Sequence, residues 1–581
     1  MKPLVLLSFS LAFLTQLLAD DSFVEESSEQ VSANMHSHQS MQSDDSEWCL
    51  SPYHSAHVDI RHNEAKGIGY KDGYTTLELF GIYDGIGSDF MPFIDLRGHI
   101  FNDGKLAGNL GVGERSFIPS INHTYGSYIY YDVRRVGHSQ TTQQISPGFE
   151  LVGERMEYRV NGYFPIVKRK GRKFDYKFDK FTGNNILLKY KQNQTMTGGD
   201  AEVGVHIPQN TTYDVYVAAG PYYFHSSNAS AWGGRVRFLG RYKEYVTLEV
   251  AYSYDKLFRN IVQGSVALTV PFGSKLKRCG RCCPQNDNLL LSRAAFAPSR
   301  FEIPVVKKVH KKEKAINPAT GNPWVVWFVN NTSHSAGTFE SPFPTLLAAQ
   351  TASAPNDMIY VFPGDGTTNG MNAGITLQDG QNFFGSGIKQ QFAAKQGTIT
   401  IPAMSSSYPT ITTGTGNVVT IGNGNVVSGF NIIAADVDGI ANVGLINGAT
   451  IANNNFTCNT LGSDGVILTG FGEYKIYNNQ FTASAANPNG SAVVLTSKGG
   501  VMSGIINHNT IFGFAGGLFM SPTNVVGYNF TFAENTLTNF ASTAITAYMA
   551  QGTTLNIVGN TFNSSNTRFA VVEAIQVETV A

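Results

Sequence analysis

The sequence predicts an all-β protein with two unlike regions: an N-terminal antiparallel transmembrane β-barrel of about 12 strands and a C-terminal right-handed parallel β-helix. The first region repeats short runs in which apolar and polar residues alternate, which is the period of a β-strand. The second repeats an asparagine motif at a spacing typical of stacked coils. Composition agrees, because 60 of the 581 residues are glycine and only 15% are charged, which favours turn-rich β structure.

The first nineteen residues, MKPLVLLSFSLAFLTQLLA, contain one positive charge at Lys2 and an apolar run that ends at Leu18. That length suits the apolar core of a secretory signal and is short for a membrane span. We therefore expect residues 1–19 to be a cleaved signal peptide. Residues 20–50 are rich in Ser, Asp, Glu and Gln and are predicted to be disordered. No later stretch has eighteen uninterrupted apolar residues, so any crossing of a membrane must use a barrel.

Residues 51–273 hold the alternating runs that predict the barrel. In Met156–Pro165, one face of the expected strand is apolar and the other carries Glu157 and Arg159. The runs are near the ~10 residues of a tilted membrane strand. A soluble β-sandwich would show similar alternation, but twelve tyrosine-rich strands with no helical interruption are unusual for one. The charges predicted to face a polar lumen are Asp95, Arg97, Arg134, Glu157, Arg159, Arg235, Arg237 and Glu249.

Four stretches occur in an order that resembles a known family: GFELVGERMEYRVNGYFPI, AEVGVHIP, GSVALTVPFG and SRFEIPVV. Together they are similar to the translocation barrel of inverse autotransporters, the intimin and invasin type, over about residues 51–307. The resemblance implies a barrel in the Gram-negative outer membrane and a following chain that passes up the pore to expose a C-terminal passenger. Outer-membrane lipid and the export and barrel-insertion machinery are then expected partners. The family's passengers are usually strings of immunoglobulin-like domains, and this chain departs from that pattern.

Residues 274–321 are interpreted as a linker. Crossing an apolar band of ~25 Å takes about eight extended or about seventeen helical residues, so the linker is long enough to thread the lumen. Its basic run from Lys307 to Lys314 could face lumenal carboxylates, and a soluble linker is the alternative. A second basic segment, residues 167–177, is expected to be a surface loop.

The cysteines favour disulfide chemistry over a metal site. Cys279, Cys282 and Cys283 form a CGRCC cluster, and no second pair of Cys or His ligands follows at the sequence spacing that zinc sites require. In an exported chain the cluster is therefore a candidate for disulfide formation.

Residues 322–567 predict the β-helix, and residues 568–581 are left as a C-terminal tail. Residues 343–352 are expected to form a short helix and residues 358–362 a buried strand, similar to the start of right-handed parallel β-helix proteins. A motif of the form Ile-x-x-Asn-x-Phe then recurs, and its asparagines would stack in a ladder that satisfies the backbone of a tight turn. The predicted ladder is Asn454, Asn479, Asn509, Asn535 and Asn560.

The same region offers little for catalysis, so we expect no enzyme, no cofactor and no metal. Polysaccharide lyases and hydrolases on this fold need convergent carboxylates or an acidic cluster with a base. Between residues 381 and 567 the acids are few and scattered, and Asp436 and Asp438 are the one close pair. These two would be the first residues to test for the alternative function, a polysaccharide-active enzyme displayed by the barrel.

The predicted function is therefore display. An outer-membrane barrel would anchor and export a surface-exposed β-helix that acts in adhesion or surface structure, with a glycan or a host-surface protein as its ligand. The near balance of 42 basic and 43 acidic residues argues against a nucleic-acid partner. A soluble secreted binding protein is the remaining alternative.

Overall fold

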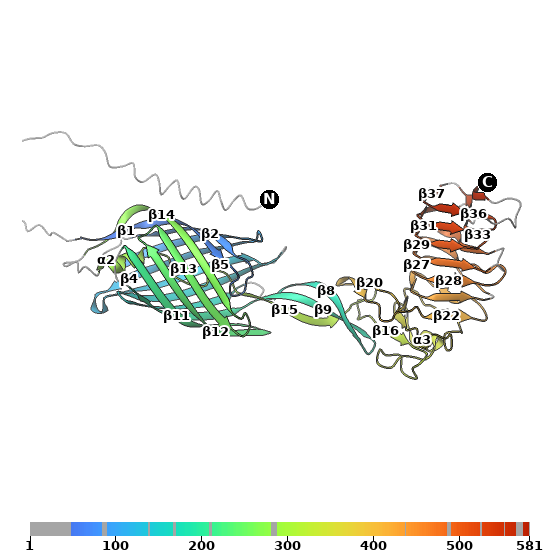
Figure 1. Ribbon diagram of the computed structural model, residues 1–581, viewed down its shortest axis with the longest axis horizontal. Coiled ribbons are helices and arrows are strands. Elements are labelled where there is room, and N and C mark those ends of the chain that lie inside the picture. The colour runs from blue at the N-terminus through green and yellow to red at the C-terminus, as the bar shows by residue number, and fades with distance from the viewer. Residues whose placement is uncertain are drawn as a thin grey trace, which may run out of the picture.

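The computed structural model describes residues 48–83, 90–137, 140–166, 170–207, 212–279, 287–435, 437–484, 490–522, 526–550, 552–564 and 573–579. The predicted signal peptide, most of the segment predicted to be disordered, Cys282, Cys283 and Asp436 lie outside these ranges. The chain is all-β, as predicted. A barrel and a solenoid occupy its two ends, with a three-stranded sheet between them (Figure 1).

Twelve antiparallel strands close into the barrel, which confirms the predicted fold and strand number. The first and last strands pair to close it, with Trp48 opposite Cys279, so the two chain ends of the barrel lie at one rim. We call this the terminal rim and the other the opposite rim. The strands are β1 (Trp48–Glu64), β2 (Tyr74–Ile82), β3 (Phe90–Phe101), β4 (Leu106–Ile118), β5 (His123–Arg135), β6 (Thr141–Gly153), β7 (Met156–Pro165), β10 (Thr197–His206), β11 (Tyr213–Ser226), β12 (Ala229–Tyr242), β13 (Val246–Asp255) and β14 (Ile261–Cys279).

Each barrel strand turns its apolar side outward. In β7, Tyr158 is 41% exposed and Val160 is 56% exposed. Glu157, which directly precedes Tyr158 and points to the other side of the strand, is 3% exposed. The alternation is that of an ordinary half-buried strand, but the buried side is the charged one. The barrel therefore has an apolar exterior and an ionised interior.

A hairpin interrupts the barrel between β7 and β10 and projects from the opposite rim (Figure 1). It consists of β8 (Lys170–Thr182) and β9 (Asn185–Thr195), and the strand β15 (Val306–Lys314) pairs with the free edge of β9. The expectation of a basic surface loop at residues 167–177 was thus wrong for residues 170–177. Their backbone groups pair with β9 in an irregular, bulged ladder, which leaves the basic side chains free to point into solvent.

The C-terminal region is a parallel β-solenoid with three short strands in most coils. One outer face is a seven-stranded sheet whose strands alternate buried and outward-facing residues. It contains β22 (Thr410–Thr413), β25 (Asn431–Ala434), β28 (Asn455–Cys458), β30 (Gln480–Ala483), β32 (Thr510–Phe512), β35 (Thr536–Thr538) and β38 (Thr561–Asn563).

The other two faces belong to one continuous fifteen-stranded sheet, because β29 and β31 each extend around a corner of the coil. Its strands are β16 (Val326–Val329), β17 (Met358–Val361), β18 (Ile375–Thr376), β19 (Asn382–Gly385), β23 (Val419–Ile421), β24 (Asn425–Ser428), β26 (Ile440–Asn442), β27 (Ile446–Ala452), β29 (Val466–Tyr477), β31 (Ser491–Asn507), β33 (Gly516–Pro522), β34 (Tyr528–Ala533), β36 (Thr543–Met549), β37 (Thr554–Val558) and β39 (Glu573–Thr579). A small hairpin, β20 (Gln390–Ala394) and β21 (Gly397–Ile401), leaves this region.

Helices are few. Helix α3 (Leu346–Ala352) lies within the segment predicted to be helical, and Thr345 caps it by accepting a hydrogen bond from the Ala348 amide. Helix α2 (Asp287–Ala294) follows the barrel, and a 3₁₀ turn, η2 (Pro119–Ile121), joins β4 to β5. Among the described residues, no helix combines the length and the apolar character needed to cross a membrane.

Candidate functional site

The barrel lumen is filled by the chain that follows the barrel, residues 287–305, which we call the lumen segment. At the terminal rim, Arg293 donates to the Gly153 carbonyl, which ends β6. At the opposite rim, the Val305 carbonyl accepts a hydrogen bond from the Met196 amide, and the chain continues as β15. The lumen segment therefore runs from the rim that holds the barrel's termini to the rim that faces the solenoid.

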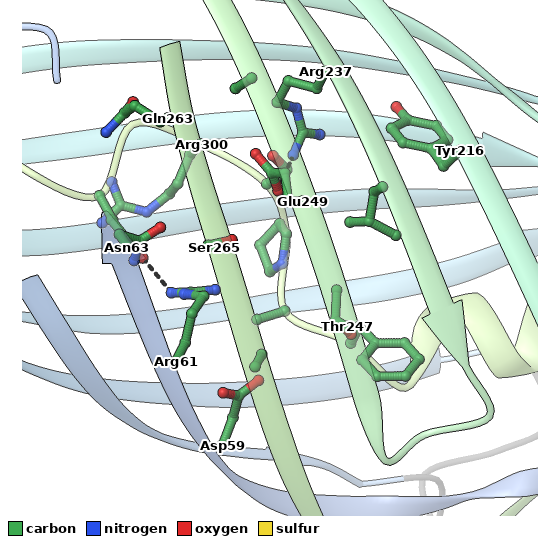
Figure 2. A pocket seen from close by; sticks show the side chains of 18 of the residues that line it. Asp59, Arg61, Asn63, Tyr216, Arg237, Thr247, Glu249, Gln263, Ser265 and Arg300 are labelled. Carbon is green, nitrogen blue, oxygen red and sulfur yellow. Dashed lines mark hydrogen bonds and ion pairs between the residues drawn. The ribbon is translucent and has the colours of Figure 1, made fainter. Parts of the chain in front are cut away.

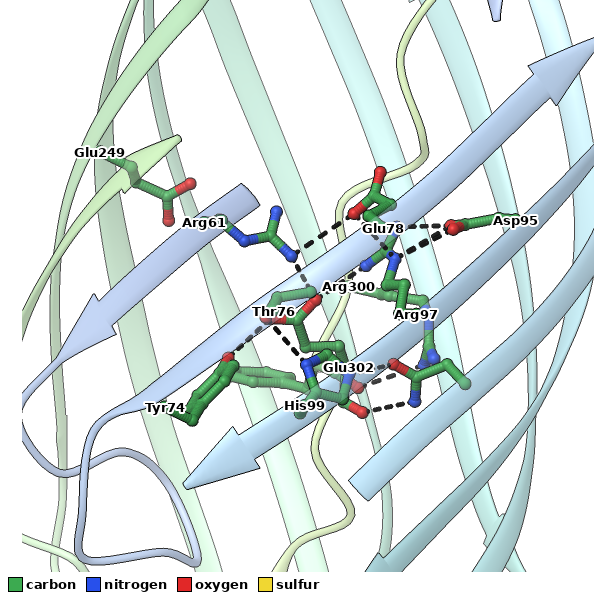
Figure 3. Close-up of polar contacts among 12 residues, drawn as sticks. Arg61, Tyr74, Thr76, Glu78, Asp95, Arg97, His99, Glu249, Arg300 and Glu302 are labelled. Atoms are coloured by element: carbon green, nitrogen blue, oxygen red, sulfur yellow. Dashed lines mark hydrogen bonds and ion pairs between the residues drawn. The ribbon is translucent and has the colours of Figure 1, made fainter. Parts of the chain in front are cut away.

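Glu302 is the centre of an ion cluster that fixes the lumen segment to three strands (Figure 3). One oxygen of its carboxylate lies 2.7 Å from the Arg61 guanidinium and 2.9 Å from that of Arg97. The other oxygen accepts a 2.6 Å hydrogen bond from the Tyr74 hydroxyl. Arg97 also contacts Glu78 at 3.1 Å and Asp95 at 2.6 Å, so its charge is shared among three carboxylates. Such charges are tolerated in a closed interior only because each has partners.

Arg300 makes a second ionic contact, to Asp132 on β5. Both side chains are fully buried, and the guanidinium bonds both carboxylate oxygens while lying 4.0 Å from the Tyr130 ring centroid. Asp132 accepts further hydrogen bonds from Asn109 at 2.7 Å and Ser146 at 2.5 Å. The carboxylate is thus saturated, which makes this pair the most enclosed attachment of the lumen segment.

Lumen side chains also hold the backbone of the segment. Arg115 donates to the Ala294 carbonyl at 2.6 Å, Asn109 to the Glu302 carbonyl at 2.7 Å, and Arg134 to the Pro304 carbonyl at 2.9 Å. These bonds occur along the whole length of the lumen. Since a carbonyl is present in every residue, these contacts hold the backbone of the segment and do not depend on its side chains.

The eight predicted lumen charges all lie on the inner side of the barrel wall. Asp95, Arg97 and Arg134 contact the lumen segment or its ion cluster, as described above. The other five pair mainly with one another and with Glu150 and Glu202 across neighbouring strands. Arg237, for example, lies 2.7 Å from Glu202 and 3.0 Å from Glu249.

A polar cavity of about 180 Å³ remains between the lumen segment and the barrel wall, lined mainly by strands β1 and β10 to β14. Figure 2 shows Arg61, Arg237, Glu249 and Arg300 directed toward this space. The lumen segment borders this cavity through Arg300, Phe301 and Glu302, so the cavity and the segment share the barrel interior. Lined by ionised groups, the cavity suits water.

The basic run Lys307–Lys314 lies outside the lumen, so it does not face lumenal carboxylates. It forms β15, where Lys312 lies 2.6 Å from Asp179 of the hairpin and Glu313 pairs with Lys173. The charged residues of the lumen segment that contact the barrel wall are Arg293, Arg300 and Glu302, which the sequence analysis missed. The stretch SRFEI did carry a signal, because its two charges alternate with Phe301 and Ile303 as on a two-faced strand.

In the solenoid, the predicted asparagines form a continuous column at one corner. Asn479 illustrates the pattern: its side-chain oxygen accepts from the Asn454 amide at 3.0 Å and from the Asn454 side chain at 3.2 Å. Its NH₂ group donates to the Ile451 carbonyl at 2.9 Å and to the Asn509 oxygen at 3.0 Å. The same bonds join Asn509 to Asn535 and Asn535 to Asn560. The side-chain amides of Asn479, Asn509 and Asn535 are thereby each bonded to the coils on both sides.

Of the two carboxylates considered for catalysis, Asp436 lies outside the described residues. Asp438 accepts a hydrogen bond from the Asp464 amide at 3.0 Å, one coil above. Asp464 in turn accepts from the Ser491 amide at 2.6 Å, and burial raises the pKa of Asp464 to about 6. These acids therefore bridge successive coils.

Cys282 and Cys283 of the cysteine cluster lie outside the described residues, and Cys279 ends β14. Cys458 is buried in the solenoid core as a free thiol, and burial raises its pKa to about 12.

No family model matches the sequence, and no curated protein matches it. Three solved structures align with the barrel at low scores. A chain from a study of the in-meso crystallisation of membrane proteins is 14% identical, with a TM-score of 0.32, and covers 44% of this chain and all of its own. The COG4313 outer-membrane channel of Pseudomonas putida F1 is 8% identical, with a TM-score of 0.27, over 40% of this chain and all of its own. The translocator domain of the autotransporter NalP from Neisseria meningitidis is 12% identical, with a TM-score of 0.19, over 37% of this chain and 87% of its own. These similarities are too weak to indicate a function, so the function is inferred from the geometry of the barrel and the solenoid.

Proposed function

We propose that this protein is an outer-membrane display protein of the inverse-autotransporter type. Its barrel anchors the chain, its lumen passes the C-terminal region outward, and the β-solenoid works at the cell surface in adhesion or surface structure. The observation that carries the proposal is the path of the lumen segment, which enters at the terminal rim and leaves at the opposite rim toward the solenoid.

The barrel exterior supports the membrane assignment. On the paired strands β11 and β12, the exposed Tyr213 lies opposite Tyr242 and the exposed Tyr223 lies opposite Trp232, ten residues farther along each strand. Ten residues at ~3.3 Å each, tilted by ~40°, span about 25 Å, the height of the apolar band of outer-membrane barrels. Aromatic pairs at both borders match the girdles of such barrels.

The solenoid surface supports a role in binding without catalysis. Most outward positions of the seven-stranded sheet carry hydroxyl or amide groups, including Thr457, Gln480, Thr510 and Thr536; Phe512 adds an exposed aromatic ring, and none of these seven strands has a charged residue. A flat, neutral, hydrogen-bonding face suits an extended neutral ligand such as a glycan chain. In this proposal the protein catalyses no reaction.

Protease shaving of intact cells tests the topology, with one tag near Asp45 and another at the C-terminus. We expect the protease to remove the C-terminal tag and spare the N-terminal one until the outer membrane is broken. Protection of both tags on intact cells would contradict surface display. Loss of both would also contradict the proposal, because Asp45 precedes β1 at the terminal rim and the proposed outward export puts that rim on the periplasmic side.

A further inference from the structure

The hairpin β8–β9 belongs to the barrel in sequence, yet the apolar residues near its tip are buried against the solenoid. Its tip reaches the first solenoid strand, where the Asn184 side chain donates to the Val326 carbonyl at 2.8 Å and the Val326 amide donates to the Asn184 carbonyl at 2.9 Å. Asn184 also donates to the Gly337 carbonyl at 3.0 Å. One barrel residue thus organises two separate segments of the first coil.

The hairpin also contributes an apolar face. Phe181, Ile186 and Leu188 are 2%, 0% and 0% exposed, and they pack in one cluster with solenoid residues that include Phe328 and Tyr360. The Phe181 ring meets the Phe328 ring edge-on, with 4.9 Å between the ring centroids. Burial this complete makes the hairpin part of the solenoid's core.

The first solenoid strands are built to be covered on both sides. All four residues of β17 are fully buried: Ile359 and Val361 face the solenoid interior, while Met358 and Tyr360 face the hairpin cluster. A strand in a later coil is covered on one side only, because Asn529 and Thr531 of β34 point outward. The first coils therefore have an outer apolar face that the later coils lack.

The emerging chain meets the hairpin before it reaches any solenoid strand. As soon as it leaves the lumen, residues 306–314 pair with β9 in nine consecutive antiparallel steps, from Val306 opposite Thr195 to Lys314 opposite Leu187. The chain then turns and returns to the hairpin tip, where Val325 bridges Asn185. In chain order, the hairpin is thus the first folded surface that the passenger contacts outside the barrel.

We propose that the β8–β9 hairpin is the template on which the passenger starts to fold. The hairpin captures residues 306–314 by backbone pairing and supplies the missing outer face of the first coils, and each later coil then stacks on the one before it. This inference rests on the proposed export function for its biological meaning. Because the template lies at the opposite rim, coils cannot form until their residues have crossed the lumen.

A refolding experiment tests the template with the full chain in detergent, where no export is needed. The test variant is Phe181→Ala/Ile186→Ala, and the matched control on the exposed side of the hairpin is Lys180→Ala/Lys189→Ala. A second control, Leu537→Ala, removes an equally buried side chain from a late coil. Barrel folding is followed by its heat-dependent gel shift, and solenoid folding by the appearance of a protease-resistant fragment.

We expect the template variant to fold its barrel at the normal rate and to form the resistant solenoid about tenfold more slowly or worse. The lysine control should refold at the wild-type rate, and Leu537→Ala should mainly speed unfolding. Refolding of the template variant at the wild-type rate would overturn the proposal, and so would equal slowing by Leu537→Ala. If the double variant disturbs the barrel, the milder Asn184→Ala removes only the tip bonds and should slow the solenoid alone.

Protease shaving of intact cells distinguishes the folding-template proposal from the export proposal. With the template variant, we expect the C-terminal tag to reach the surface while the solenoid is degraded by added protease. If the wild-type tag never reaches the surface, the export function fails, and the refolding result still decides whether the hairpin is a template.

Discussion

The barrel and the solenoid are built from the same alternating strands, but they are turned inside out relative to each other. In the barrel the buried side carries Arg97, Asp132 and Glu157, and Val160 and its neighbours are exposed. In the solenoid Phe456 and Ile476 are buried, and Thr457 and Gln480 face outward. Alternation therefore reports only that a strand has two different environments. On the alternating positions the polar residues differ in kind, because paired full charges line the enclosed lumen whereas Thr457 and Gln480 on the outer face of the solenoid are neutral.

The two regions also use buried polar groups differently. The lumen satisfies its charges across strands that are distant in sequence, as in the contact of Glu302 with Arg61. The solenoid satisfies its amides between consecutive coils, as in the contact of Asn479 with Asn509. The first arrangement holds one particular segment, whereas the second can be repeated indefinitely. Four predictions sharpen this comparison.

The largest effect is expected in the asparagine column. Asn479→Ala removes the acceptor of the Asn454 amide and the donor to the Ile451 carbonyl in a buried corner. At ~1–3 kcal/mol for each of these two groups left unsatisfied, the solenoid should lose about 2–6 kcal/mol of unfolding free energy. Urea unfolding followed by tyrosine fluorescence measures it. The neighbour Asn455→Ala, at the outer surface, should stay within about 0.5 kcal/mol, and equal losses in both variants would refute the column's role.

The next effect is expected in the lumen. Asp132→Ala leaves the Arg300 charge buried without its carboxylate, which should destabilise docking of the lumen segment by about 3–5 kcal/mol. Proteolysis of residues 287–305 in the folded protein measures that opening. The double variant Asp132→Ala/Arg300→Ala should be less destabilised than the sum of the single variants. The exposed pair Lys105 and Asp103 is the control and should contribute at most about 1 kcal/mol; strict additivity at Asp132 and Arg300 would argue against a coupled pair.

An arginine placed on the outer face of the barrel or of the solenoid tests whether that face contacts lipid or water. Val250→Arg, on the exposed side of β13 midway between the aromatic pairs, should destabilise the barrel in lipid vesicles by about 2–4 kcal/mol. Thr482→Arg, on the outer face of the solenoid, should change stability by no more than about 0.5 kcal/mol. A neutral Val250→Arg would mean that the apolar exterior meets water and would favour the soluble alternative.

The smallest effect concerns pH. Burial raises the pKa of Asp464 from its usual value near 4 to about 6, so the folded solenoid binds a proton that the unfolded chain releases. This contribution to stability is therefore present below about pH 4 and is lost as the pH rises through about 6. Because Asp464 is partly exposed, we expect only about 1–2 kcal/mol. The urea midpoints of the wild type and Asp464→Asn, compared from pH 4 to pH 7, measure this contribution. If the two midpoints changed with pH in parallel, the raised pKa of Asp464 would be contradicted.

Much of this architecture could be predicted from the sequence because it depends on local periods. The two faces of Met156–Pro165 gave the barrel's inside and outside, and the spacing of Asn454, Asn479 and Asn509 gave the coils. What could not be predicted depends on contacts between distant segments. The basic residues 170–177 look like a loop in isolation and become a strand only because β9 and β15 continue the sheet. Likewise, nothing near Arg300 in the chain indicates that Asp132 is its partner.

The lysine run illustrates the same limit. A cluster of positive charges next to a predicted lumen suggests carboxylate partners inside it, yet Lys312 meets Asp179 on the hairpin outside. The two sites offer similar chemistry, and only the length of chain between Glu302 and Lys312 decides which one is reached.

The uniform geometry of the asparagine column has a consequence for how such a chain can change over generations. Because each turn presents the same donors and acceptors to the next, duplicating or deleting one whole repeat joins surfaces that already match. One gained repeat extends the molecule by about 4.8 Å, the distance between neighbouring strands. Only the end seated on the hairpin is fixed by contacts with the barrel. Recombination between repeats can therefore tune how far the protein reaches while the anchor stays the same.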